Sequence, residues 1–405
     1  MKKSRKILAL VLSLALVFAL AACTNNDTPS GGDTTSPSPS ASTPVETPDA
    51  SKTPENTPAA SDYAVAMITD YGDITDQSFN QTTYEACNEY CTANGVKFNY
   101  YKPNGDSTAE RVAMVDAAVV DGYNVIVMPG YAFAETIKET AEMYPDVIFI
   151  ALDVGEGDLG DYAASLPSNV YCAVYQEELC GYMAGYAAVK LGYSHLGFLG
   201  GMAVPAVVRY GYGFVQGADA AAAETGTDVT VEYVYGNQFF GDADITGVMD
   251  TWYQNLGVEA VFACGGGIYT SAAEAAAKTG GKVIGVDTDQ SGIIDAYGEG
   301  MTVTSAMKGL AATVKTMLAE VEAGNFANHG GKIETLGLVS ATDVESNYVQ
   351  LPVATTQFND NFTEADYVAL VGKMLDGTVT VSNDTTVEPA ANATTATVNS
   401  YGNIK

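Results

Sequence analysis

The chain has 405 residues, of which 47% are hydrophobic and 10% aromatic, enough for a folded protein of two or three domains. Its 49 Asp and Glu residues against 18 Lys and Arg give a net charge of −31, which argues against the clustered basic surface that nucleic-acid binding requires. With only two histidines, the chain cannot form a multi-histidine metal site.

The first residues have the pattern of a secretion signal. Four basic residues between Lys2 and Lys6 precede an apolar run over 7–20, and no acid occurs before Asp27. The run is short for a membrane span, which needs about 20 apolar residues. Because four of the 18 basic residues lie here, 14 basic residues face all 49 acidic residues in the rest of the chain, a net charge of −35.

The end of this run, Leu20-Ala21-Ala22-Cys23, resembles a bacterial lipoprotein cleavage box. The resemblance implies that residues 1–22 are removed and that Cys23 is lipidated, which anchors the chain at the extracytoplasmic face of the cell membrane. The alternative is an ordinary cleaved signal with an incidental cysteine. Residues 23–60 are rich in Thr, Pro and Ser with almost no large apolar side chains, so we expect a disordered tether there.

From Tyr63 onward, short β-branched or aromatic runs alternate with stretches of helical periodicity. This alternation predicts βαβ units and parallel sheets, and near-continuous apolar runs such as AVAMIT fit strands that are covered on both faces. We therefore expect an α/β fold with two doubly wound lobes. The expected strands are 63–69, 97–101, 125–128, 147–152 and 170–173 in the first series, and 196–199, 229–235, 260–263, 282–286 and 301–304 in the second.

Several local signals mark the helices. Ser107 and Glu110 have the spacing of a capping box, and Gly95 suits a helix C-terminus. Cys87 and Cys91 fall on one stripe of the helix expected after residue 80, so we predict buried thiols there.

A glycine-rich run and a pair of cysteines are two further features of the sequence. The run 211–217 is rich in glycine, but its third glycine is one position late for the dinucleotide fingerprint, so we expect these glycines to serve helix packing. A disulfide between Cys172 and Cys180 is possible outside the cell, and the sequence leaves it open.

The residues that follow the strands are the candidates for a ligand site, because ligands of open α/β sheets bind at the carboxyl ends of the strands. They combine carboxylates that accept hydrogen bonds, aromatic rings that stack on planar groups, glycines and one lysine. In chain order they are Asp70, Phe79, Asn80, Asp153, Phe239, Phe240, Gly265, Gly267, Asp287 and Lys308.

Taken together, these segments resemble the basic membrane protein family of substrate-binding lipoproteins, over roughly residues 65–375. The segments that carry the resemblance are Asp76-Gln77-Ser78-Phe79-Asn80, Gly200-Gly201-Met202-Ala203-Val204-Pro205, Phe240-Gly241-Asp242, Ile284-Gly285-Val286-Asp287-Thr288-Asp289-Gln290 and Thr304-Ser305-Ala306-Met307-Lys308. The resemblance implies a type I periplasmic-binding-protein fold over residues 61–377, with two lobes joined by a hinge.

The expected first lobe covers about 61–173 and about 306–323. The expected second lobe covers about 174–305 and the C-terminal segments. Residues 378–405 are a C-terminal extension with no counterpart that we can assign and no role that the sequence indicates.

In the nucleoside-binding type of this family, the resemblance implies a base held between two aromatic rings, one from each lobe. Phe79 matches the first ring and Phe240 the second, with the adjacent Phe239 as the alternative. Asp70 and Asn80 match residues at the base. Asp287 and Lys308 match residues that hold the ribose, Asp153 matches an acid that lines the cleft, and Gly265 and Gly267 stand at the family's glycine run.

We therefore expect a monomeric, lipid-anchored receptor that binds a neutral nucleoside, most of all a purine, and delivers it to the permease of an ABC importer. We expect no enzymatic activity, no cofactor and no metal, and the acidic composition argues against phosphorylated ligands. Gln77 stands where the family usually has a basic residue before Ser-Phe-Asn, and Tyr269 is an added residue after the glycine run. The identity of the nucleoside therefore stays open. The alternatives are another planar or sugar-like ligand such as riboflavin, and a nucleoside hydrolase that uses carboxylates.

Overall fold

The fold is that of a computed structural model, which describes residues 63–405. The expected signal peptide (1–22), the lipidation site Cys23 and the tether (23–60) lie outside the described residues. Within residues 63–405, every helix is too short or too polar to cross a membrane.

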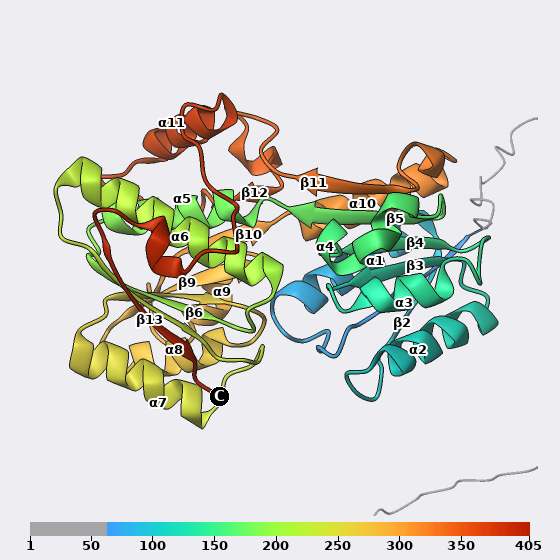
Figure 1. Cartoon of the computed structure of the whole chain (residues 1–405), viewed down its shortest axis with the longest axis horizontal. Coiled ribbons are helices and arrows are strands. Elements are labelled where there is room, and N and C mark those ends of the chain that lie inside the picture. The colour runs from blue at the N-terminus through green and yellow to red at the C-terminus, as the bar shows by residue number, and fades with distance from the viewer. Residues whose placement is uncertain (1–62) are drawn as a thin grey trace, which may run out of the picture. The chain divides into compact units, whose positions relative to one another are not determined.

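The first lobe is built on a six-stranded parallel sheet with the order β11-β5-β4-β3-β1-β2 (Figure 1). Its strands are β1 (Ala64–Ile68), β2 (Lys97–Tyr101), β3 (Val125–Pro129), β4 (Ile148–Leu152), β5 (Val170–Tyr175) and β11 (Lys332–Leu336). Side chains alternate between the two faces along a strand, so Val65 and Met67 pack against α1 (Phe79–Asn94) and α10 (Leu310–Glu322). The other face packs against α2 (Thr108–Val120) and α3 (Phe133–Thr140).

The second lobe is built on a seven-stranded sheet with the order β12-β10-β9-β8-β6-β7-β13, in which only β12 is antiparallel. Its strands are β6 (His195–Gly200), β7 (Thr230–Tyr235), β8 (Ala260–Cys264), β9 (Lys282–Asp287), β10 (Thr302–Lys308), β12 (Val349–Gln350) and β13 (Thr397–Asn403). The helices are α5 (Glu177–Lys190), α6 (Pro205–Thr225) and α11 (Glu364–Leu375) on one face, and α7 (Ala243–Thr251), α8 (Tyr269–Ala276) and α9 (Ser291–Ile294) on the other.

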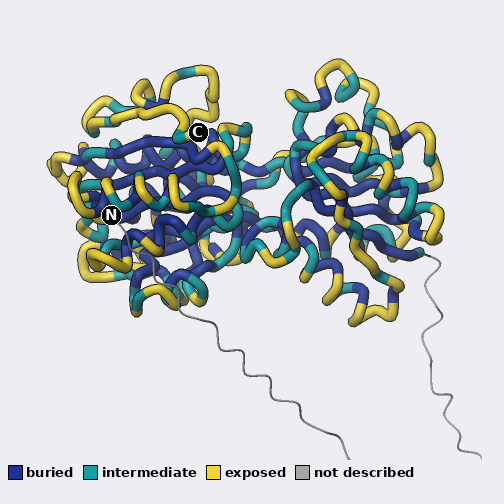
Figure 2. Tube along the Cα trace, turned by 90° about the horizontal axis from the view of Figure 1, so that it is seen from below, coloured by how far each residue is buried: buried dark blue, intermediate teal, exposed yellow. Residues whose placement is uncertain are grey.

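This architecture confirms the expected fold class of two doubly wound lobes with parallel sheets. All ten expected strands are present as β1–β10, and β11, β12 and β13 are additional. The chain passes between the lobes after β5, after β10 and between β11 and β12. Figure 2 shows buried segments in the interior of each lobe and exposed segments at its surface.

The local signals in the sequence have the expected structural counterparts. Ser107 caps α2 by accepting a hydrogen bond from the backbone N–H of Glu110, and Gly95 ends α1 with a φ of 68°. Cys87 and Cys91 are buried on one face of α1. The five cysteines among the described residues are all free thiols, so the disulfide that the sequence left open is not formed.

Helices α5 and α6 pack backbone to backbone through four glycines. Gly181 and Gly185 lie on α5, and Gly213 and Gly217 lie on α6. A Cβ atom placed on any of the four would lie 2.0–2.1 Å from a carbonyl oxygen of the other helix. Only glycine allows this approach, which confirms that the glycine-rich run serves helix packing.

Candidate ligand-binding cleft

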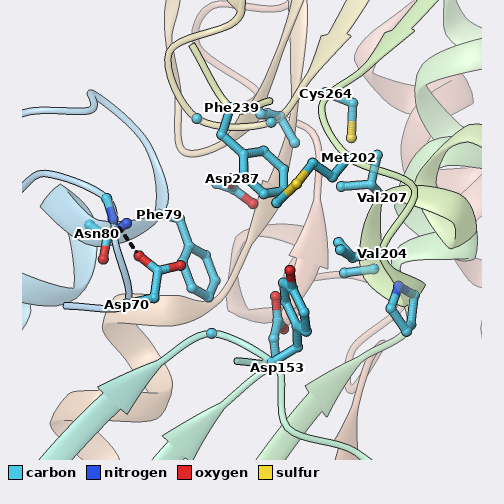
Figure 3. Close-up of a pocket in the computed structure, with 18 of the residues that line it drawn as sticks. Asp70, Phe79, Asn80, Asp153, Met202, Val204, Val207, Phe239, Cys264 and Asp287 are labelled. Carbon is cyan, nitrogen blue, oxygen red and sulfur yellow. Dashed lines mark hydrogen bonds between the residues drawn. The ribbon is translucent and has the colours of Figure 1, made fainter. Parts of the chain in front are cut away.

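A cavity of about 870 Å³ lies where the carboxyl ends of strands from both sheets face each other. All nine ligand-binding residues expected from the sequence line it, namely Asp70, Phe79, Asn80, Asp153, Phe240, Gly265, Gly267, Asp287 and Lys308. Phe239 and an apolar patch at Met202, Val204 and Val207 also line it (Figure 3). The structure therefore brings residues that are far apart in the sequence to one site.

The loops of this site hold strained backbone. Among the described residues, four that are not glycine have a positive φ, between 57° and 65°: Gln77, Asp153, Asn237 and Asp287. Asp287 is the last residue of β9, and the other three lie in loops that follow strands. All four are at the carboxyl ends of strands, which is the side of the sheets that faces the cavity. Such conformations cost free energy and persist where the surrounding structure enforces them, which is typical of sites that must aim particular side chains.

Two aromatic rings point into the cavity from opposite lobes. Phe79 is the first residue of α1, and Phe239 lies in the loop after β7 on the facing side (Figure 3). The ring of Tyr71 is roughly parallel to that of Phe239, with centroids 6.3 Å apart. Phe240 touches the cavity but is 60% exposed, so Phe239 is the better-enclosed ring on the second lobe.

The neighbouring glycines make room for Phe239. A Cβ atom on Gly201 or Gly265 would lie within 2.8 Å of the Phe239 ring. The backbone N–H of Gly267 donates a hydrogen bond to the carbonyl oxygen of Phe239 at 2.8 Å. The glycine run after β8 thus sets the position of the second ring.

A polar group lies beside Phe79 at the start of α1. Asp70 accepts hydrogen bonds from the backbone N–H groups of Tyr71 and Gly72 at 2.7 Å each, and the Asn80 side chain also bonds to it (Figure 3). Burial raises the pKa of Asp70, and these hydrogen bonds oppose the rise. Asn80 Oδ1 is buried without a hydrogen-bond partner among the described residues, so it is available to a donor on a ligand.

A buried charge network lies next to Phe79, with Lys308 Nζ 5.1 Å from the centroid of its ring. Lys308 Nζ lies 2.7 Å from Asp153 Oδ2, 3.1 Å from Glu177 Oε1 and 3.9 Å from Asp287 Oδ1. Arg209 Nε donates to Glu177 Oε2 at 2.6 Å. When all five groups are ionised, three acids face two bases, and the network carries one negative charge in excess.

Burial and mutual attraction change the pKa values of the groups in this network. Burial raises the pKa of Asp153 to about 6, although Lys308 opposes the rise. Burial also raises the pKa of Asp287. Burial works to lower the pKa of Lys308, but attraction to Asp153, Glu177 and Asp287 outweighs it, and the pKa is raised. Lys308 therefore stays charged, and Asp153 titrates closer to neutral pH than an exposed aspartate does.

Two hydrogen bonds join the loop before α1 to the second lobe beside the cavity. Ser78 Oγ donates to Asp287 Oδ2 at 2.6 Å, and Gln290 Nε2 donates to the carbonyl oxygen of Gln77 at 3.0 Å. The loop before α1 thus contacts the second lobe directly.

The sequence did not point to Glu177 or Arg209. Neither was among the residues expected at the strand ends, since Glu177 begins α5 and Arg209 lies in the second turn of α6. The only signal was a pair of acids, Glu177 and Glu178, directly after the fifth strand. Among residues 63–405, no cluster of His, Cys, Asp and Glu has the arrangement of a metal site.

Taken together, the side chains can hold a flat ring between two aromatic faces, accept hydrogen bonds from its edge, and bind a neighbouring polar group near Lys308 and Asp153.

Several known proteins are similar to this chain in sequence. The family model described as "ABC transporter substrate-binding protein PnrA-like" matches residues 63–361. The chain is 26% identical over 332 residues to the ABC transporter nucleoside-binding protein BmpA of Lactococcus lactis, which covers 78% of this chain and 89% of that protein. It is 28% identical over 185 residues to an uncharacterized lipoprotein of Pyrococcus horikoshii, over 45% of this chain and 44% of that protein.

Solved structures share the fold. An ABC transporter solute-binding protein from Aeropyrum pernix superimposes with a TM-score of 0.60 at 22% identity, over 80% of this chain and 88% of that one.

Proposed function

The chain belongs to the family of PnrA-like ABC transporter substrate-binding proteins, and we propose that it binds a nucleoside, with purines first, in the cleft between its lobes. The observation that carries this proposal is the pair of rings, Phe79 and Phe239, that face the same cavity from opposite lobes. A purine between them would complete its second stacking face only when the lobes close, so ligand binding would favour the closed form.

The polar groups beside the rings fit the rest of a nucleoside. Asn80 Oδ1 is an unpaired acceptor that an N–H group on the base would fill. Lys308 lies over the Phe79 ring and pairs with Asp153, whose Oδ1 is also buried without a partner among the described residues. We propose that this oxygen accepts a hydrogen bond from a ribose hydroxyl and that Lys308 donates one.

The charges favour a neutral ligand over a nucleotide. Eight acidic and three basic side chains of the described residues line the cavity. All three bases are already paired, Lys102 with Asp73, Arg209 with Glu177 and Lys308 with Asp153. A phosphate would therefore meet more repulsion than attraction.

We further propose that the protein is anchored through a lipid on Cys23 and that it delivers its ligand to the permease of an ABC importer. The cleavage-box sequence before Cys23 supports the anchor, and so does the relative in Pyrococcus that is named a lipoprotein. The family supports delivery to a permease. Mass spectrometry of the chain from a bacterial membrane fraction tests the anchor, because a mature N-terminus other than lipidated Cys23 excludes it.

The proposal is tested by calorimetry and thermal shift with inosine, guanosine, adenosine, uridine, riboflavin and AMP. A nucleoside at about 100 times its dissociation constant should stabilise the protein by roughly 2.7 kcal/mol. Binding of riboflavin alone would point to a flavin receptor, and a preference for AMP would overturn the proposal. Free base released during a long incubation would identify a hydrolase instead.

Alanine substitutions should separate the stacking rings from their neighbour. We expect Phe79→Ala and Phe239→Ala each to weaken nucleoside binding by roughly 1–3 kcal/mol, which is the range for stacking of a base on an aromatic ring. Phe240→Ala is the matched control and should have a much smaller effect, because that ring is 60% exposed. A large loss in Phe240→Ala with none in Phe239→Ala, measured by calorimetry, would reverse the assignment.

Nucleoside affinity should depend on pH through Asp153. A hydroxyl donates best to the ionised carboxylate, and the pKa of Asp153 is about 6 without ligand. Affinity should therefore be full above pH 7 and should fall below pH 6, by up to about tenfold per pH unit. Calorimetry between pH 5 and pH 8 measures this, and Asp153→Asn should flatten the profile. An affinity that increases as the pH falls would exclude the role proposed for Asp153.

A further inference from the structure

The segment 376–405 lies beyond the residues matched by the family model, which end at 361, yet it docks along the second lobe (Figure 1). Its last part is β13, which pairs in parallel with β7 from Thr397 and Thr230 onward. Its earlier part is held on α6: Gln216 exchanges two hydrogen bonds with the backbone of Ser382, and Asp219 accepts from the backbone N–H groups of 394–396. Thr385 reaches the cavity itself.

A buried carboxylate makes this docking specific. Glu232 on β7 is 3% exposed and accepts hydrogen bonds from Tyr401 Oη at 2.6 Å and from Asn399 Nδ2 at 3.2 Å. His195 Nε2 lies 2.8 Å from the same carboxylate. Two of the three partners of this buried group thus come from β13, and a buried carboxylate that lacks its partners is costly.

The end of the segment reaches the loop that carries Phe239. The backbone N–H of Ile404 donates to the carbonyl oxygen of Tyr235, the last residue of β7, at 2.8 Å. Lys405 then forms an ion pair with Asp242 and lies 3.6 Å from the carboxylate of Asp244. Asp242 is the N-cap of α7, and its pKa is lowered to about 2, chiefly by the bond from Lys405.

Asp242 in turn holds the loop from within. Its Oδ2 atom, which faces Lys405, also accepts a hydrogen bond from Gln238 Nε2 at 2.8 Å. Gln238 directly precedes Phe239, and its amide also donates to the carbonyl oxygen of Phe240 at 2.9 Å. A continuous set of contacts therefore runs from Lys405 through Asp242 and Gln238 to the residues on either side of Phe239.

We propose that Lys405 is a positioning residue for the cleft: through Asp242 and Gln238 it holds the loop 236–242 so that Phe239 faces the cavity, and it thereby slows the release of bound ligand. The identity of that ligand rests on the function proposed above. The ordering of the loop does not depend on it.

Hydrogen exchange on the unliganded full chain tests whether Lys405 orders the loop 236–242. Lys405→Met keeps the aliphatic stem and removes the charge. We expect the amides of Asp242 and Gly267, which donate to Ser271 Oγ and to the Phe239 carbonyl, to exchange about two- to fivefold faster, the range for an exposed ion pair. Lys405→Arg should restore slow exchange. Lys278→Met is the matched control. Lys278 pairs at 2.7 Å with Asp250, which lies on α7 away from the loop, so this variant should leave the exchange of the loop unchanged.

Release of inosine or guanosine, measured by stopped flow, tests the second part. Lys405→Met should release the nucleoside about two- to fivefold faster, with the melting temperature of the unliganded protein close to that of the parent. Loop exchange that is unchanged in Lys405→Met overturns the proposal whether or not a nucleoside binds. Faster exchange with unchanged release overturns the effect on the ligand. A parent chain that binds no nucleoside overturns the proposed function instead, and loop exchange then decides the role of Lys405.

Discussion

Replacing Lys308 by methionine is expected to destabilise the protein by about 3–5 kcal/mol, the usual cost of removing one partner from a buried ion pair. Lys308 is 5% exposed, and three carboxylates lie within 3.9 Å of its ammonium group. Among residues 63–405, the substitution leaves these acids with Arg209 as their only neighbouring base. Urea denaturation at pH 7 measures the loss, and nucleoside binding should be lost with it.

The pH dependence of the stability of Lys308→Met shows whether repulsion between the remaining acids causes the loss. Because Asp153 and Asp287 have raised pKa values, they take up protons first as the pH falls, and the repulsion left by Lys308→Met should shrink toward pH 5. Lys315→Met is the matched control: its pair with Glu89 is exposed, and its loss should cost less than about 1 kcal/mol. Equal losses in the two variants, or a loss in Lys308→Met that does not change with pH, would contradict the role of the buried network.

Gly217→Ala is expected to cost about 3 kcal/mol or more, at the upper end of the range for overpacked cores. The new methyl group would lie 2.0 Å from the carbonyl oxygen of Tyr182, and a backbone atom in a buried helix cannot move aside as a flexible side chain can. Helices α5 and α6 would have to separate. The start of α6 also lines the cavity, so the pair between Arg209 and Glu177 and the affinity for ligand should both suffer.

Gly247→Ala provides the control for this prediction. Gly247 is an exposed residue of α7, and no atom lies within 4 Å of the place that the new methyl group would take. Alanine there should therefore stabilise the protein by about 0.5–1 kcal/mol through helix propensity. Chemical denaturation of both variants gives the comparison. A Gly217→Ala protein as stable as the parent would show that α5 and α6 can separate at little cost.

The fold was largely predictable because its strands carry their own signal. The runs that became β1, β3 and β8 are apolar throughout and are buried on both faces, as central parallel strands must be. The strands β12 and β13 were not predictable in this way. The first has only two residues, and the second, Thr397–Asn403, is polar and almost wholly exposed, so pairing with β7 and not local composition determines it.

The site was predictable in part for a similar reason. Residues such as Asp153 and Asp287 directly follow strands or end them, and parallel strands bring their carboxyl ends together. The direction of Phe239 and Phe240 was not predictable, because they lie in a loop after the left-handed Asn237, where no regular periodicity applies. The contact of Glu177 with Lys308 depends on packing between segments more than 100 residues apart, which no local pattern encodes.

Strand β13 also bears on how copies of this chain behave toward one another. It covers the side of β7, a strand that is buried along almost its whole length and would otherwise offer unpaired backbone groups to a neighbouring molecule. The new outer edge is a poor template for another strand, because it is polar and its register shifts between Ser400 and Asn403. Natural proteins protect their sheets against aggregation with edges of this kind. We therefore expect the segment to disfavour extension of the second sheet from one molecule to another.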